Sequence, residues 1–130
     1  MIRRTRREGY LLIMVVCFAS GCGGSEAPLV ARGKPVAHWL QELKSSSAKA
    51  RKQAVFCLGL VGAKDTAAIP ALIQALKDDD AEVRRTAVLA LLNIGPPARE
   101  AVPALEQARS DRDAQVRSYA VKAIQRIQAS

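Results

Sequence analysis

The sequence contains few of the residues on which enzymes depend. It has a single histidine, His38, and no serine, cysteine or carboxylate cluster accompanies it. No glycine-rich phosphate loop, no Cys/His set at metal-ligand spacing and no nucleophile elbow is present. The acidic run from Asp78 to Asp80 lacks the glycine and the later glutamate of a calcium loop, so it is typical of a solvated turn. The sequence therefore predicts a protein that is not an enzyme and that uses no cofactor and no metal ion.

Aromatic residues are also scarce, at 4% of the chain, and this argues against nucleic acid as a partner. The formal net charge is +8, but beyond the first 21 residues the basic residues occur in nothing longer than pairs, such as Arg51-Lys52 and Arg84-Arg85. Proteins that bind single strands combine a basic groove with aromatic stacking platforms, and neither is visible here. This positive charge is better suited to weak attraction to anionic lipid head groups than to binding nucleic acid.

The first 21 residues do not resemble the start of a folded domain. Four arginines within residues 3–7 precede an unbroken apolar run from Tyr10 to Ala19. Ten apolar residues are too few for an ordinary membrane-spanning helix but suit the hydrophobic region of a secretory signal. Removal of residues 1–21 leaves 16 basic and 11 acidic residues, a net charge of +5. We therefore expect residues 1–21 to be a signal peptide and the protein to be exported.

The small residues Ala19-Ser20-Gly21 lead directly into Cys22, and this arrangement resembles a bacterial lipoprotein signal with its lipobox. Alanine stands at position 19, where leucine is commoner. The resemblance implies that the thiol of Cys22 receives a diacylglycerol and that Cys22 becomes the mature N-terminus. The chain would then be lipid-anchored at the cell membrane or the outer membrane. A secreted form without lipid and an uncleaved membrane anchor are the two alternatives.

Only one cysteine remains after these assignments. Cys17 leaves with the signal and Cys22 is acylated, so Cys57 has no partner for an intramolecular disulfide. We expect Cys57 to be a small buried packing residue. Residues 22–34 contain Gly and Pro and show no helical period, so they are predicted to form a flexible tether ahead of a folded domain at residues 35–130.

The domain is built from a segment that occurs three times, without gaps, at a spacing of 33 residues. The copies start at Ala48, Ala81 and Ala114. An earlier amphipathic helix precedes each copy, which gives repeats of about 35–62, 66–95 and 98–128. Serine or aspartate stands before each second helix, where its oxygen can cap free amides. Gly62 and Gly95 are expected to end the first two second helices in the left-handed conformation. This self-similarity predicts a stacked repeat protein.

The repeat pattern is Ile-Pro-Ala-Leu-Ile-x-Ala-Leu, an aspartate turn, then Val-Arg-Arg-x-Ala-x-x-Ala-Leu-x-x-Ile-Gly. It resembles HEAT repeats in their short bacterial form, over about Val36 to Ile127. The resemblance implies an all-α fold, an α-solenoid of three helix pairs with six helices. In HEAT repeats a turn aspartate and a later arginine form a structural ladder between layers. The residues that match this ladder are Arg51, Asp78, Arg84, Asp111 and Arg117. The six-residue spacing matches Asp78 with Arg84 and Asp111 with Arg117, whereas Arg51 has Ser45 at that spacing and is able to reach Asp78 in the next layer instead.

The second helices also predict a partner-binding face. Second helices line the concave face of HEAT stacks, so the residues opposite the core stripe should be exposed there. We expect an apolar patch with a basic rim, formed by Lys52, Phe56, Arg85, Leu89, Leu92 and Lys122. The predicted function is a lipid-anchored, non-enzymatic scaffold that binds another protein at the bacterial cell envelope. An accessory factor related to HEAT-like phycobilin lyases and a purely structural envelope protein are the alternatives.

Overall fold

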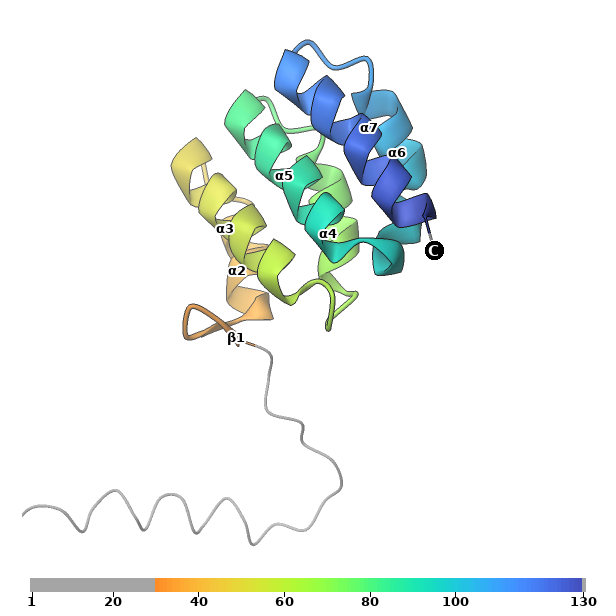
Figure 1. Cartoon of the computed structure of the whole chain (residues 1–130). Coiled ribbons are helices and arrows are strands. Elements are labelled where there is room, and N and C mark those ends of the chain that lie inside the picture. The colour runs from red at the N-terminus through yellow and green to blue at the C-terminus, as the bar shows by residue number, and fades with distance from the viewer. Residues whose placement is uncertain (1–29, 130) are drawn as a thin grey trace, which may run out of the picture.

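The computed structural model describes residues 30–129 and arranges them as six α-helices stacked in pairs. In chain order the elements are β1 (Val30–Ala31), β2 (Lys34–Pro35), α2 (Val36–Glu42), α3 (Ala48–Val61), α4 (Ala68–Ala75), α5 (Ala81–Ile94), the 3-10 helix η1 (Pro96–Ala101), α6 (Val102–Ala108) and α7 (Ala114–Gln128). The second helices α3, α5 and α7 lie side by side in one layer, and α2, α4 and α6 form the layer behind them (Figure 1). This is the predicted all-α solenoid of three helix pairs.

Each second helix begins at a capped turn. Asp80 and Asp113 each accept hydrogen bonds from the backbone amides two and three residues later, at 2.9 to 3.1 Å. Ser47 accepts one from the amide three residues later, at 3.4 Å. These bonds satisfy amides that have no partner inside the helix, and the aspartates also favour the positive end of the helix dipole. The starts of α3, α5 and α7 are therefore set by local sequence.

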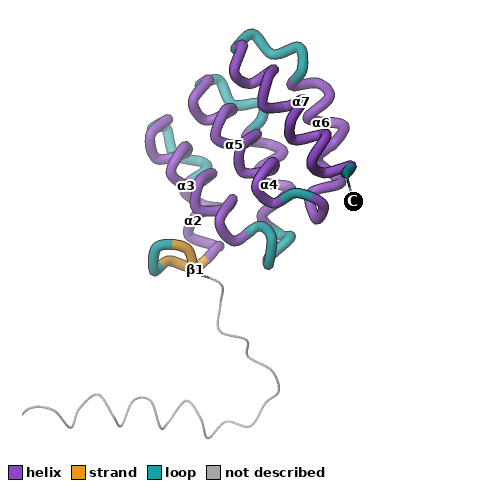
Figure 2. The backbone as a smooth tube through the Cα atoms, in the orientation of Figure 1, coloured by secondary structure: helices purple, strands orange, loops and turns teal. Residues whose placement is uncertain are grey.

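The core is a continuous layer of aliphatic side chains between the two helix layers. The large side chains that are fully buried include Leu58, Ile69, Leu72, Leu91, Leu105 and Ile127. Alanine recurs at positions 54, 87 and 120 with no exposed surface. The same small buried side chain thus recurs in each repeat, so the 33-residue period repeats one packing unit. The loops that connect the helices are short (Figure 2).

A hairpin precedes the first helix. Val30 pairs with Pro35 and Ala31 with Lys34, across a turn in which Arg32 and Gly33 both have positive φ, 52° and 73°. The indole Nε1 of Trp39 donates to the carbonyl of Ala31 at 3.1 Å. The prediction of a flexible tether over residues 22–34 is therefore wrong for residues 30–34, which pack on the first helix pair. The signal peptide, Cys22 and the rest of the predicted tether lie outside the described residues.

The two glycines that follow second helices differ from each other. Gly95 has φ of 71° and ψ of −136°, so it uses the freedom of glycine to leave the helix. Gly62 has φ of −60° and ψ of −23°, so the prediction of a left-handed cap there is wrong. A side chain at Gly62 would collide with the end of the Ile94 side chain. The close approach of Ile94 from the next repeat, and not a positive φ, therefore favours a small residue at this position.

Candidate partner-binding groove

An arginine–aspartate ladder joins the repeats along one edge of the stack. Arg51 donates from Nε and Nη2 to the two carboxylate oxygens of Asp78, at 2.8 and 3.0 Å. Arg84 does the same with Asp111, at 2.9 and 3.1 Å. Each pair joins residues 27 positions apart, so the carboxylate of each ion pair comes from the following repeat. The match of Asp78 with Arg84 and of Asp111 with Arg117 is therefore wrong, and the reach of Arg51 to Asp78 is confirmed. Arg117 occupies the equivalent position on α7.

The paired residues of the ladder are shielded from solvent. The side chain of Arg84 is 5% exposed and that of Asp111 is 12% exposed. Hydrogen bonding from Arg51 is the main cause that holds the pKa of Asp78 below its ordinary value. Burial raises the pKa of Asp111, but the hydrogen bonds from Arg84 and from the Asp113 amide outweigh it and leave the pKa lowered. Both carboxylates are thus held ionised between repeats, which is a structural arrangement.

Two of the basic residues predicted to border the binding face, Lys52 and Arg85, are engaged in ion pairs within and between repeats. Lys52 Nζ lies 3.4 Å from a carboxylate oxygen of Glu82, and Arg85 Nη2 lies 2.8 Å from the other. Arg85 Nη1 also donates to Gln115 at 2.7 Å. Its Nε lies 3.5 Å from Asp113, which is an ionic contact but too long for a hydrogen bond. Lys52 and Arg85 therefore connect the repeats near the starts of the second helices.

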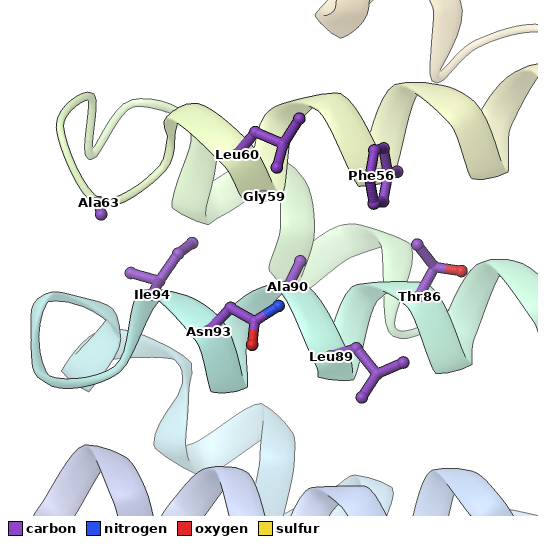
Figure 3. Close-up of a pocket in the computed structure, with 9 residues that line it drawn as sticks. All are labelled: Phe56, Gly59, Leu60, Ala63, Thr86, Leu89, Ala90, Asn93 and Ile94. Carbon is purple, nitrogen blue, oxygen red and sulfur yellow. The ribbon is translucent and has the colours of Figure 1, made fainter. Parts of the chain in front are cut away.

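An apolar groove runs between α3 and α5. It has a volume of about 460 Å³ and is lined by Phe56, Gly59, Leu60, Ala63, Thr86, Leu89, Ala90, Asn93 and Ile94. Leu60 is 59% exposed, Phe56 49% and Leu89 36%. The two helices come close together at Gly59 and Ala90, since a Cβ atom on Gly59 would stand 2.7 Å from that of Ala90. Figure 3 shows the larger side chains projecting from the two helices around this point.

The predicted face coincides with the groove only in part. Phe56 and Leu89 line it. Leu92 was expected to be exposed beside them, but it is half-buried against the core, so that prediction is wrong. The reason is geometric: α5 packs on both α3 and α7, which leaves only a narrow strip of its surface open. Lys122 is exposed on α7, where its Nζ lies 5.7 Å from the centre of the Tyr119 ring.

Leu60 is the groove residue that sequence reasoning missed. It is the most exposed large apolar residue of the described chain. The other two copies carry Asn93 and Arg126 at the same repeat position. An apolar residue at a position that is polar in the other copies could have identified it, because solvent-facing helix positions are normally polar.

The described residues contain no constellation that could hold a metal ion. No group of three or more His, Cys, Asp or Glu side chains at ligating distance occurs within residues 30–129. Cys57 is buried, and burial raises the pKa of its thiol, so it is a packing residue. His38 lies 3.1 Å from Lys34 Nζ and packs edge-on against Trp39. None of the helices in this part of the chain is long and apolar enough to cross a membrane.

Stacked helix pairs joined by a ladder, with a groove between second helices, define an α-solenoid repeat protein. The family model for HEAT repeats matches residues 36–128, and the chain belongs to the HEAT-repeat family. No curated protein matches the sequence.

Two solved structures are similar to the chain. The chain is similar to the complex of CpcE and CpcF of phycocyanin lyase from Nostoc sp. PCC7120, with 29% identity, a TM-score of 0.64, and coverage of 81% of this chain and 42% of that one. It is also similar to a designed armadillo repeat protein in complex with the peptide (KR)4, with 22% identity, a TM-score of 0.62, and coverage of 72% and 46%. The second match shows the fold alone. The chain spans less than half the length of either structure.

Proposed function

We propose that this protein binds another protein through the groove between α3 and α5, and that it acts as a non-enzymatic interaction module. The observation that carries the proposal is the exposure of Phe56, Leu60 and Leu89 around one groove. Contiguous exposed apolar surface is uncommon on soluble domains and marks interaction sites. The neighbouring charges are paired with one another, so the apolar side chains supply the attraction.

The form of the groove indicates what it accepts. Gly59 and Ala90 make a shallow floor without side-chain bulk, while Thr86 and Asn93 add polar atoms at the side formed by α5. Thr86 donates its hydroxyl to the carbonyl of Glu82 at 2.7 Å, which leaves its methyl group toward apolar contacts. A partner segment with one or two large apolar side chains, set in a polar surround, fits this arrangement.

A photocrosslinking amino acid at Leu60 tests this function in intact cells. We expect a discrete protein adduct, which the double variant Phe56→Asp, Leu89→Asp reduces at least about tenfold, because a buried carboxylate without a partner strongly disfavours an apolar interface. Both substituted residues are exposed, so circular dichroism should report unchanged helix content.

The matched control places the same crosslinker at Gln74, which is exposed on α4 in the other helix layer. An adduct equal from Gln74 and Leu60, or one that the double variant leaves intact, would refute the groove as the binding site. The absence of any adduct would favour the alternative that the protein is a purely structural component of the envelope.

A second candidate function is that of an accessory factor related to phycobilin lyases. It is supported by the 29% identity to the CpcE and CpcF complex of phycocyanin lyase. In that case the groove would hold an open-chain tetrapyrrole in place of a protein segment. The two functions differ in one observable: a change in the visible absorption of an added bilin that is lost in the same double variant would favour the lyase-related function.

We further propose that Cys22 carries a lipid that holds the domain at the bacterial cell envelope. The support is the sequence alone, in which Ala19-Ser20-Gly21-Cys22 directly follows a signal-like apolar run. Metabolic labelling with an alkyne fatty acid should label the wild-type chain and not Cys22→Ala. The wild-type chain should sediment with membranes and be released only by detergent, whereas the variant should be absent from the membrane fraction. Cys57→Ala is the control, since a buried thiol is no acceptor. Labelling that survives in Cys22→Ala would contradict the proposal.

A further inference from the structure

The three ladder arginines have the same geometry toward their own repeat. In each, Nη1 donates to two backbone carbonyls of the preceding turn, five and six residues earlier, at 2.8 to 3.2 Å. These bonds fix the guanidinium plane. In Arg51 and Arg84 the other edge, Nε and Nη2, is then directed at an aspartate of the next repeat. In Arg117 the same edge has no acceptor among residues 30–129, although the orienting bonds are in place.

The residue four positions after each arginine shows the same contrast. Val55 and Val88 are fully buried, and each lies on a second helix that packs against the next one, whereas Val121 on α7 is 39% exposed. Arginine and valine at this spacing lie on one side of the helix. The edge of α7 thus presents a fixed guanidinium and a β-branched apolar side chain. The same two groups occur on α3 and α5, where the next second helix docks.

The first helix of the third pair does not offer a matching apolar surface. Ile73 and Leu76 belong to the core or pack against it, and Leu76 lies beside Ala104 and Ala108 of the third pair. Their repeat counterparts are Glu106 and Arg109, which are exposed and form an ion pair at 2.8 Å. A complete helix pair therefore has poor complementarity to this end of the stack. The open edge fits a single helix laid along α7.

The two internal examples define the beginning of such a helix. Asp78 and Asp111 each use one carboxylate oxygen to accept the backbone amide two residues later, at 2.9 and 2.8 Å, while the arginine binds both oxygens. The residue whose amide is accepted, Asp80 or Asp113, then caps the helix. The recognised element is an Asp-x-Asp turn followed directly by an amphipathic helix.

We propose that the edge formed by Arg117 and Val121 docks a helix of a different protein that begins with an Asp-x-Asp turn. A second copy of this chain does not fit head to tail, because Ser45 stands where the aspartate is required. The serine hydroxyl cannot accept a bidentate, charge-assisted pair from a guanidinium. This site is separate from the groove between α3 and α5, and neither depends on the other.

Fluorescence anisotropy with one defined peptide tests the docking edge. The probe has the sequence of Asp111–Gln128, because that segment covers the equivalent edge at Arg84 and Val88; it is stapled between the positions of Ser118 and Lys122, which are exposed, to hold it helical. The full chain, kept in mild detergent, should bind it saturably. Arg117→Ala in the protein and Asp→Asn at the first position of the peptide should each weaken binding at least about tenfold.

Arg109→Ala is the matched control, since it removes one positive charge from the same end of the stack without touching the guanidinium of Arg117. We expect its affinity to stay within about twofold of wild type. An equal loss in Arg109→Ala and Arg117→Ala would reduce the effect to general charge attraction and overturn the proposal. So would the absence of binding at about 1 mM peptide, crosslinking of the peptide from Leu60 and not from Val121, or self-association of the chain that Arg117→Ala abolishes.

Discussion

Replacing Arg84 with alanine is expected to lower the free energy of unfolding by about 3 kcal/mol, because it breaks a buried ion pair and strands its partner. Arg84 makes a bidentate contact with Asp111 and two more bonds to the carbonyls of Asp78 and Asp79. Alanine leaves the poorly exposed carboxylate of Asp111 without its counter-ion. For a domain of this size the loss corresponds to a fall of roughly 15 °C in melting temperature, measurable by circular dichroism.

Arg117→Ala is the control for this prediction. Arg117 has the same bonds to its own turn but no carboxylate partner in the described residues. Its removal should cost at most about 1 kcal/mol, and the contrast isolates the contribution of the link between repeats. Equal destabilisation by the two substitutions would mean that each arginine stabilises only its own turn, and would contradict a stabilising link between repeats.

Acid provides an independent check on the same pair. The folded-state pKa of Asp111 lies below its ordinary value of 3.8, so the ionised carboxylate contributes its full stabilisation above that value. As the pH falls through the lowered folded-state pKa, the carboxylate is protonated and this contribution disappears. The difference in melting temperature between wild type and Arg84→Ala should therefore be greatest near neutral pH and shrink in strong acid.

The repeat pattern could predict the fold because its recurring positions have local or periodic causes. Helix starts follow from cap residues such as Asp80 and Asp113, and the core follows from apolar spacing. The reach of Arg51 to Asp78 is a consequence of stacking identical units, so one period was enough to suggest it. The hairpin at residues 30–35 has no counterpart in the other repeats, and periodicity could not reveal it.

The groove was harder to predict because it depends on the distance between helices. A helical period assigns Leu92 to the surface, but neighbouring second helices on both sides cover it. Likewise the sequence predicts that Gly62 ends its helix in the left-handed conformation, whereas the structure gives it a close contact with Ile94. Such features depend on how closely neighbouring helices approach each other, and no single position of the sequence encodes that distance.

Replacing Gly59 with valine is expected to lower the free energy of unfolding by about 3 kcal/mol, since it forces extra bulk into a close contact between α3 and α5. Even a single Cβ at Gly59 would lie 2.7 Å from the Cβ and 3.2 Å from the Cα of Ala90. Neither atom can turn away, because one is backbone and the other is fixed to it. The helices must separate, which also removes the floor of the groove, so binding at the groove should be lost together with stability.

Alanine at the same position separates crowding from helix propensity. Gly59→Ala gains about 1 kcal/mol of helix propensity in the middle of α3, yet we expect a net loss, because the rigid contact with Ala90 costs more than this gain. Gly62→Ala should cost less than Gly59→Ala, because the nearest atom is the terminal methyl of Ile94, which can rotate aside, while Ile94 Cγ1 at 3.1 Å and the Leu58 carbonyl oxygen at 3.2 Å still crowd the added Cβ.

The exchange variant Gly59→Ala, Ala90→Gly moves the missing methyl group from α3 to α5 and restores the close approach. Thermal unfolding of the two single variants and the double variant forms a cycle in which crowding appears as a favourable coupling energy of at least about 1 kcal/mol. Ala90→Gly alone costs helix propensity in α5, and without crowding Gly59→Ala would have the same favourable effect on either background, which gives a coupling energy near zero. A Gly59→Ala substitution that destabilises the wild type but stabilises the Ala90→Gly variant would show that the glycine at position 59 sets the spacing of the second helices, and with it the depth of the groove.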